Sequence, residues 1–204
     1  MQSLAKIQDN LSKEIIKQDT FEKIQKVAGV DISFETNNNA IAAAVLIDFK
    51  NLEILEEKTL KVKLLFHYNA GFLGFREADA MISVLKTLKN NYEVLMVNGH
   101  GIMHPRGFGL ASHVGMLMEK PAIGVAKRLT AGNYNFKSGN SAKYVLSGNK
   151  TVCAYIDGKY ISIGHKISLE TAMNVVLKTS IFKIPEPIRK AHILATQTMK
   201  NELN

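Results

Sequence analysis

The order of extended and helical segments is the feature that most constrains the fold of this chain. Three runs of strand-forming residues come first, at residues 27–34, 40–49 and 54–66. The turn-forming segments Asn37–Asn39 and Lys50–Asn51 separate them, which favours an antiparallel meander. Helical patterns then alternate with short apolar strands, in the order 77–88, 93–97, 108–118 and 122–126. Because helical crossovers join parallel strands, the sequence predicts an α/β fold with a mixed sheet, an antiparallel meander followed by parallel strands, flanked by helices.

The two ends of the chain add further elements. An amphipathic helix is expected at residues 3–18, and the polar, glycine-bearing segment Gly132–Ser141 is typical of a loop. Short strands are expected at residues 144–146, 151–156 and 160–163. A last long helix opens at Ser168, and Pro185 and Pro187 predict that nothing helical follows near the C-terminus. No repeat or domain boundary is evident, so residues 1–204 are expected to form a single domain.

Amino-acid composition limits which class of partner the protein could bind and in which cellular compartment it would work. The formal net charge of +8 favours a polyanionic partner, although a basic balance can also serve solubility alone. Cys153 is the only cysteine, so neither an internal disulfide nor a thiolate zinc cluster can form, and its apolar surroundings predict a buried structural thiol. No membrane-length apolar segment or signal-peptide core is recognisable, so we expect a cytoplasmic protein without a membrane partner.

Two carboxylates stand out as candidates for chemistry. Asp31 lies between Val30 and Ile32 in an apolar strand, where a charge is unfavourable unless it is paired or bound to a metal. The alternative is a surface-facing Asp in an alternating strand, because Ser33 would share its face. Glu77 sits at a helix start, where an acid also complements the helix dipole. The local sequence leaves both alternatives open.

Glycines and basic residues gather between these acids and the next strand. The turn Asn98–Gly101 follows a parallel-type strand, where ligands bind in open α/β sheets, and Gly99 and Gly101 permit positive φ and close approach to a flipped base. A tight turn alone would explain the same glycines. His104 and Arg106 add a titratable group and a phosphate-binding fork. Lys127 and His165 are each either site residues or ordinary residues of a strand end or turn.

Acids for a divalent cation and bases for phosphate are what phosphodiester hydrolysis requires, so this span predicts a nuclease site. Carboxylates around Mg²⁺ would let it polarise a phosphate oxygen and lower the pKa of a bound water. Oxygen ligands without thiolates favour Mg²⁺ over zinc, with Mn²⁺ as a substitute.

At these residues the chain resembles endonuclease V, a family of repair nucleases for deaminated bases with a ribonuclease-H-like fold. The matching segments run in order through residues 27–192. They are Ala28–Phe34, Gly71–Glu77, Gly99–Ile102, His104–Arg106, Gly109–His113, Gly124–Lys127, Gly164–His165, Pro185–Pro187 and Ala191–His192.

The resemblance implies a Mg²⁺-dependent deoxyribonuclease V, which we expect to be a monomer. Its substrate would be DNA containing deoxyinosine, or RNA containing inosine. Cleavage would fall at the second phosphodiester bond 3′ to the hypoxanthine and leave 3′-hydroxyl and 5′-phosphate ends.

The same resemblance assigns roles to individual residues. Asp31 and Glu77 fall on metal-binding carboxylates, and His104, Lys127 and His165 on further active-site positions. Tyr68 falls on a tyrosine that separates the strands as a wedge. The pocket for the flipped base would include Gly71, Leu73, Gly99 and Gly101, with Arg106 near phosphate.

Two departures from the family pattern bear on activity. Asn98 stands where the family has a metal-binding Asp; its amide oxygen can ligate Mg²⁺ but brings no negative charge. We therefore expect weaker metal affinity and a lower rate, unless neighbouring groups compensate. The wedge segment reads His67-Tyr68-Asn69-Ala70 in place of Pro-Tyr-Ile-Pro, and the loss of both prolines removes rigidity.

These observations leave three hypotheses. The leading one is a Mg²⁺-dependent endonuclease in which Asp31, Glu77 and Asn98 hold the metal. The second, suggested by Asn98, is a protein that recognises the lesion without cutting. The third is a generic α/β protein whose basic charge only aids solubility.

Overall fold

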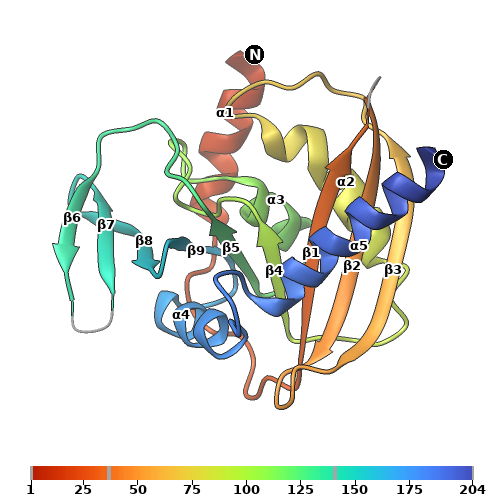
Figure 1. Cartoon of the computed structure of the whole chain (residues 1–204). Helices are drawn as coiled ribbons and strands as arrows, with labels where there is room; N and C mark the ends of the chain where they lie inside the picture. The colour runs from red at the N-terminus through yellow and green to blue at the C-terminus, as the bar shows by residue number, and fades with distance from the viewer. Residues whose placement is uncertain (1, 36–37, 140–141, 204) are drawn as a thin grey trace.

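Nine strands in the described part of the chain form one continuous sheet. The computed structural model describes residues 2–35, 38–139 and 142–203. The strands lie in the order β3-β2-β1-β4-β5-β9-β8-β7-β6, with helices on both faces (Figure 1). The predicted turn residue Asn37 and the end of the predicted loop at Ser141 lie outside the described residues.

The first half of the sheet is the predicted meander. Strands β1 (Lys26–Phe34), β2 (Asn39–Asp48) and β3 (Ile54–Lys63) pair antiparallel in sequence order. Residues of β1 and β2 are almost all buried because helices cover both of their faces, whereas β3 alternates between exposed and half-buried residues as the edge strand.

The predicted parallel pairs follow, and they position the candidate site. β4 (Val94–Asn98) lies parallel to β1 and β5 (Ala122–Ala126) lies parallel to β4. The helices α2 (Leu73–Leu85) and α3 (Leu110–Leu117) make the crossovers. In this register Val30 pairs with Val97, so the next residues, Asp31 and Asn98, come side by side at the carboxyl edge.

The second half of the sheet is antiparallel. β9 (Lys159–His165) pairs with β5 on one side and with β8 (Lys150–Ile156) on the other, followed by β7 (Lys143–Ser147) and β6 (Asn135–Ser138). The prediction of a loop throughout 132–141 is therefore wrong at β6. All four β6 residues are exposed, so its pairing with β7, rather than an apolar face, holds it as a strand.

The helices also differ from the expected ones at the two ends of the chain. Helix α1 (Gln2–Leu11) and the short 3₁₀ helix η1 (Ser12–Glu14) replace the longer predicted opening helix. Helix α4 (Leu169–Lys178) begins as predicted, because the Ser168 hydroxyl accepts a hydrogen bond from the Thr171 amide at 3.1 Å. Contrary to the expected helix stop at the prolines, α5 (Glu186–Leu203) runs to the end of the described chain. Pro187 lies in its first turn, where a missing N–H is tolerated and the fixed φ favours a helix.

Two apolar layers sandwich the sheet. One face packs residues such as Val27, Val45 and Ile161 against α4 and α5, and the other packs Val30, Leu46 and Leu95 against α2 and α3. Cys153 is fully buried beside Met103, as expected, and burial raises the pKa of its thiol to about 12, which disfavours the reactive thiolate. No helix of the described residues is both long and apolar enough to cross a membrane.

Candidate active site

The centre of the candidate site is the contact between the ends of β1 and β4. Asn98 donates a hydrogen bond from Nδ2 to Asp31 Oδ1 at 3.1 Å. Asp31 is only 5% exposed, and desolvation raises the pKa of its carboxyl group above the ordinary value. A buried acid at a strand end is thus joined to the Asn98 amide.

Glu77 reaches the same centre from the second turn of α2. It is 6% exposed, and the described residues provide it with neither a hydrogen bond nor an ion pair. Burial, together with repulsion from the Asp31 charge, raises the pKa of Glu77 to about 7, against an opposing effect of Arg76. Asp31 and Glu77 are therefore two buried acids close enough to repel, the arrangement that a cation between them would stabilise.

Sequence reasoning missed a fourth member of this centre, His192 on α5. Its Nδ1 lies 2.7 Å from Asp31 Oδ2, so the ring N–H donates to a carboxylate whose other oxygen accepts from Asn98. This contact lowers the pKa of Asp31 and opposes the effect of its burial. The expected helix stop at the prolines hid His192, although the motif Ala191–His192 could have marked it.

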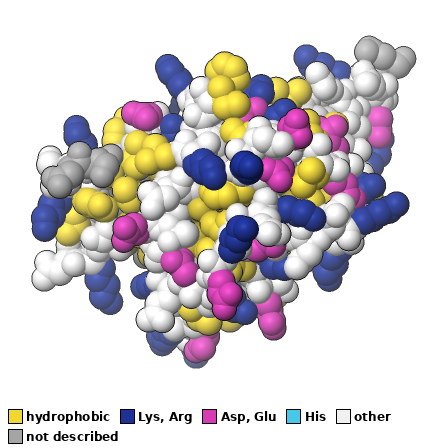
Figure 2. Space-filling view, turned by 90° about the horizontal axis from the view of Figure 1, so that it is seen from below, with side chains coloured by type: hydrophobic (Ala, Val, Ile, Leu, Met, Phe, Trp, Pro, Cys, Tyr) yellow, Lys and Arg dark blue, Asp and Glu magenta, His cyan; other side chains and the backbone are white. Residues whose placement is uncertain are grey.

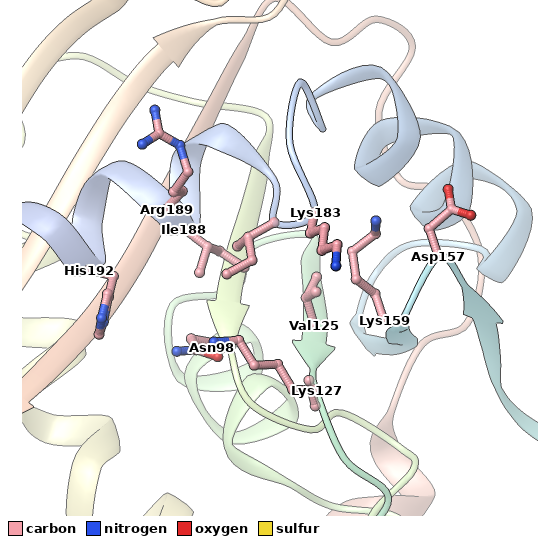
Figure 3. Close-up of a pocket in the computed structure, with 12 residues that line it drawn as sticks. Asn98, Val125, Lys127, Asp157, Lys159, Lys183, Ile188, Arg189 and His192 are labelled. Atoms are coloured by element: carbon pink, nitrogen blue, oxygen red, sulfur yellow. The ribbon is translucent and has the colours of Figure 1, made fainter.

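A cavity of about 450 Å³ opens beside this centre (Figure 3). Asn98 and His192 line one side, and Lys127, which follows the last residue of β5, extends along it toward Asn98. Lys127 therefore lines the same cavity as Asn98, and its expected role near the attacking water stays a prediction. The rest of the lining combines apolar residues with a mainly basic rim, and it consists of Val125, Ala126, Asp157, Gly158, Lys159, Lys183, Ile184, Ile188 and Arg189.

A second cavity of about 420 Å³ is lined by two of the four residues predicted to hold the flipped base, Gly71 and Leu73. Tyr68, His104 and Arg106 also line this cavity. Gly71 has φ of +83°, a conformation that favours glycine. Tyr68 is 71% exposed, so its ring is free to stack on a base.

A hydrogen-bonded network builds the wall of this second cavity. The Gly71 carbonyl accepts from His104 Nε2 at 3.0 Å and from Arg106 Nη2 at 2.6 Å. Arg106 also donates to Gln8 Oε1 at 2.6 Å and lies over the Phe72 ring. Arg106 is therefore held by the protein itself, which is a structural use of the fork expected to bind phosphate.

His104 is fixed by the same network in its neutral form. Its Nδ1 accepts from the Arg106 amide at 3.2 Å, which leaves the proton on the Nε2 that faces the Gly71 carbonyl. Burial, with the nearby Arg106 charge, lowers the pKa of His104 to about 4. The structure places His104 in the base cavity, apart from the two acids.

The turn glycines serve packing rather than an open backbone. Gly99 donates its N–H to the Val125 carbonyl at 3.0 Å, and Gly101 donates to Ser162 Oγ at 2.8 Å. Neither has positive φ, contrary to the expectation, and a Cβ on Gly101 would lie 2.0 Å from the Ile163 carbonyl oxygen. The two amides that were expected to read a flipped base are thus already occupied.

His165 lies away from this centre. It pairs with Ala122 at the start of β5, whereas Lys127 follows the opposite end of that strand. His165 is 5% exposed, and its Nδ1 accepts a hydrogen bond from the Ile16 amide at 3.4 Å. The structure therefore does not bring His165 together with the other predicted site residues; it joins β9 to the segment after η1.

The oxygen atoms of Asp31, Glu77 and Asn98 suit a hard cation, although the Asn98 amide is a weaker ligand than a carboxylate. No group of three or more His, Cys, Asp and Glu residues in the described chain could hold a metal ion. Asp31 and Glu77 nevertheless offer two carboxylates, and turning over the Asn98 amide would aim Oδ1 where Nδ2 now points. Two acids and an amide oxygen fit Mg²⁺, which prefers oxygen ligands and retains several waters.

The sequence of this chain is similar to those of known proteins. The chain matches the family model described as Endonuclease V over residues 9–193. Endonuclease V of Dictyoglomus thermophilum is 36% identical over 207 residues, 97% of this chain and 90% of that protein.

Solved structures are similar over nearly the whole chain. The catalytic domain of human endonuclease V has a TM-score of 0.90 at 30% identity, covering 99% of this chain and 96% of that one. Endonuclease V of Ciona intestinalis, in complex with a 24mer DNA containing an inosine followed by a ribo-adenosine, has a TM-score of 0.81 at 28% identity, covering 96% and 95%. These similarities confirm the expected ribonuclease-H-like fold.

Proposed function

The chain belongs to the endonuclease V family of DNA repair nucleases, and we propose that it hydrolyses the second phosphodiester bond 3′ to a hypoxanthine, with Mg²⁺ as its cofactor. The observation that carries the proposal is the meeting of Asp31, Glu77 and Asn98 at one point of the sheet edge. Glu77 lies one turn beyond Leu73 of the base cavity, and Asn98 lines the lysine-rimmed cavity. A strand with its lesion in the base cavity would therefore pass the acids.

Asp31, Glu77 and the Asn98 amide oxygen would hold the Mg²⁺. When bound, Mg²⁺ supplies Lewis-acid chemistry that polarises a phosphate oxygen and acidifies water. His192 keeps the Asp31 carboxylate oriented through its 2.7 Å contact. Lys127 would hold the non-bridging oxygens of the scissile phosphate and offset the negative charge that develops on them.

The base cavity would receive the flipped hypoxanthine. Its wall is rigid because His104 and Arg106 both hold the Gly71 carbonyl, and a preformed wall lowers the entropy lost on binding. Tyr68 would stack in the gap that the flipped base leaves. The Gly99 and Gly101 amides already donate hydrogen bonds within the protein. Recognition of the hypoxanthine would therefore depend on Gly71, Leu73 and the side chains of this cavity.

The test is cleavage of an oligonucleotide with a single deoxyinosine, with Mg²⁺ or with EDTA. We expect one cut, with a 3′-hydroxyl and a 5′-phosphate, that requires Mg²⁺ and is absent from the matched deoxyadenosine strand. An RNA strand with a single inosine forms a second arm and identifies the preferred sugar. Intact deoxyinosine and inosine strands at stoichiometric enzyme would refute the catalytic proposal.

A lesion-binding protein without cleavage is the second candidate, favoured by the amide at position 98. In the structure Asn98 donates to Asp31 where a carboxylate would add negative charge for a cation. The comparison is between the protein with Asn98 and the variant Asn98→Asp. A large gain in cutting at constant lesion affinity would support this candidate, whereas equal cutting by both proteins would exclude it.

A further inference from the structure

A groove leads from the acidic centre across the start of β9 to the loop between α4 and α5. The lysine-rimmed cavity of about 450 Å³ and a neighbouring, more open hollow of about 680 Å³ share lining residues, so they form one continuous groove. The shared residues are Asp157, Lys159, Lys183, Ile184 and Arg189. The catalytic proposal uses only its inner end, at Asn98 and Lys127.

Lys159 is the residue that gives this groove a chemical preference. It is 4% exposed yet lines the groove, and no described residue accepts a hydrogen bond from it or forms an ion pair with it. Its ammonium group is not enclosed by the protein but opens into the groove, where it is available to bind an anion.

Two further lysines complete an anion-binding rim. Lys127 and Lys183 are exposed, line the groove and lack an ion-pair partner among the described residues. Figure 3 shows the Lys159 and Lys183 side chains entering the same space above Val125, with Asp157 on the far side of Lys159. Arg189 does not compete for an anion, because its Nε and Nη2 are bonded to the Glu186 carboxylate, each at 2.7 Å. On the face in Figure 2, basic side chains are interspersed with acidic ones.

The outer end of the groove carries an exposed aromatic side chain. Phe182 is 62% exposed, and the Arg189 guanidinium lies 5.1 Å from its ring centroid. An aromatic ring that is anchored on one side and open on the other is a platform for a nucleic acid base, and adjacent lysines follow the phosphates. An apolar floor, three free lysines and an exposed ring together suit a single strand.

We propose that this groove binds the nucleic acid strand on the 3′ side of the cleaved bond, with its phosphates on Lys159 and Lys183 and a base on Phe182. The direction rests on the proposed function: the lesion occupies the base cavity on one side of the acids, so the groove on the other side takes the segment that acquires the 5′-phosphate. The groove would thereby align the scissile phosphate and hold that product end.

The test measures binding in EDTA, where no strand is cut, by fluorescence anisotropy. Two single strands carry one deoxyinosine and the same 5′ segment, and they end two or eight nucleotides 3′ to it. Wild-type protein should bind the longer strand more tightly. Lys159→Met and Lys183→Met should each lose about tenfold or more on the longer strand, the value of a charge-assisted hydrogen bond, and should keep their affinity for the shorter one. Each change should also reduce the salt slope by about 0.7.

Lys137→Met, on the exposed edge strand β6, is the matched control and should behave as wild type on both strands. Because Lys183 is exposed, its replacement tests the groove even if Lys159→Met folds poorly. Equal losses on both strands, or no loss on the longer one, would overturn the proposal. The same pair with deoxyadenosine separates the two claims: no preference for deoxyinosine counts against the lesion pocket, whereas a length-dependent loss on either pair supports the groove.

Discussion

Replacing Glu77 by Gln should stabilise the metal-free protein while it removes a proposed metal ligand. Glu77 is buried beside Asp31 without a hydrogen-bond partner among the described residues, and its pKa is raised from 4.5 to about 7. The native state therefore binds this proton more tightly than the unfolded state does. Stability from this group is fully present below pH 4.5 and is lost as the pH rises through 7.

The size of the effect follows from that pKa. A shift of about 2.5 pH units at about 1.4 kcal/mol each is a loss of about 3 kcal/mol by pH 8. Gln has nearly the same shape and stays neutral, so the stability difference between Glu77→Gln and wild type should grow by about 3 kcal/mol from pH 4.5 to pH 8. At about 2–4 °C per kcal/mol, the gain in Tm should be roughly 6–12 °C.

Urea unfolding in EDTA, across this pH range, measures the difference directly. The exposed Glu22, changed to Gln, is the matched control and should give a difference that does not vary with pH. Added Mg²⁺ should stabilise wild type at pH 8 and leave Glu77→Gln nearly unchanged, since only the intact pair of acids holds the ion. A Glu77→Gln difference that is the same at pH 4.5 and pH 8 would refute the reasoning.

Three further changes separate structural roles from functional ones. Gly101→Ala should destabilise the protein by about 1–3 kcal/mol in urea unfolding, because its Cβ would meet the Ile163 carbonyl oxygen at 2.0 Å; unchanged stability would contradict the packing role. His165→Ala should lower the unfolding free energy but keep the cleavage rate per folded molecule, and a slower rate at unchanged stability would restore His165 to the site. Tyr68→Ala should weaken binding to deoxyinosine in duplex DNA by about tenfold, with a smaller loss on single strands, and equal duplex affinity would exclude the wedge.

Much of the fold is legible in the sequence because its strands are continuous apolar runs between clear turns. β2 and β5 follow that rule, and the parallel register of β1 and β4 brings Asp31 to Asn98. Strand β6 does not follow this rule, because all its residues are exposed and only its pairing with β7 defines it as a strand. Helix α5 was not predicted, because a proline that ends one helix is also favourable in the first turn of another.

The site is less predictable from the sequence than the fold is, because its contacts depend on how distant segments pack together. His192 contacts Asp31 only because α5 packs over β1, so the misread prolines hid a partner of the main acid. His165 belongs to a matching motif but sits at the other end of β5 from Lys127. Gly99 and Gly101 read equally as a ligand turn or a packed turn, and only the bonds made by their amides show the packing.

The most direct measurement of the central claim is calorimetric titration of the protein with Mg²⁺, repeated with Asp31→Asn and Glu77→Gln. If these two acids and Asn98 form one cation site, wild type should bind Mg²⁺ at pH 8 and each variant should lose that binding. Affinity should fall about tenfold per pH unit below 7, as a proton competes at Glu77. Equal Mg²⁺ binding by wild type and both variants would contradict the account.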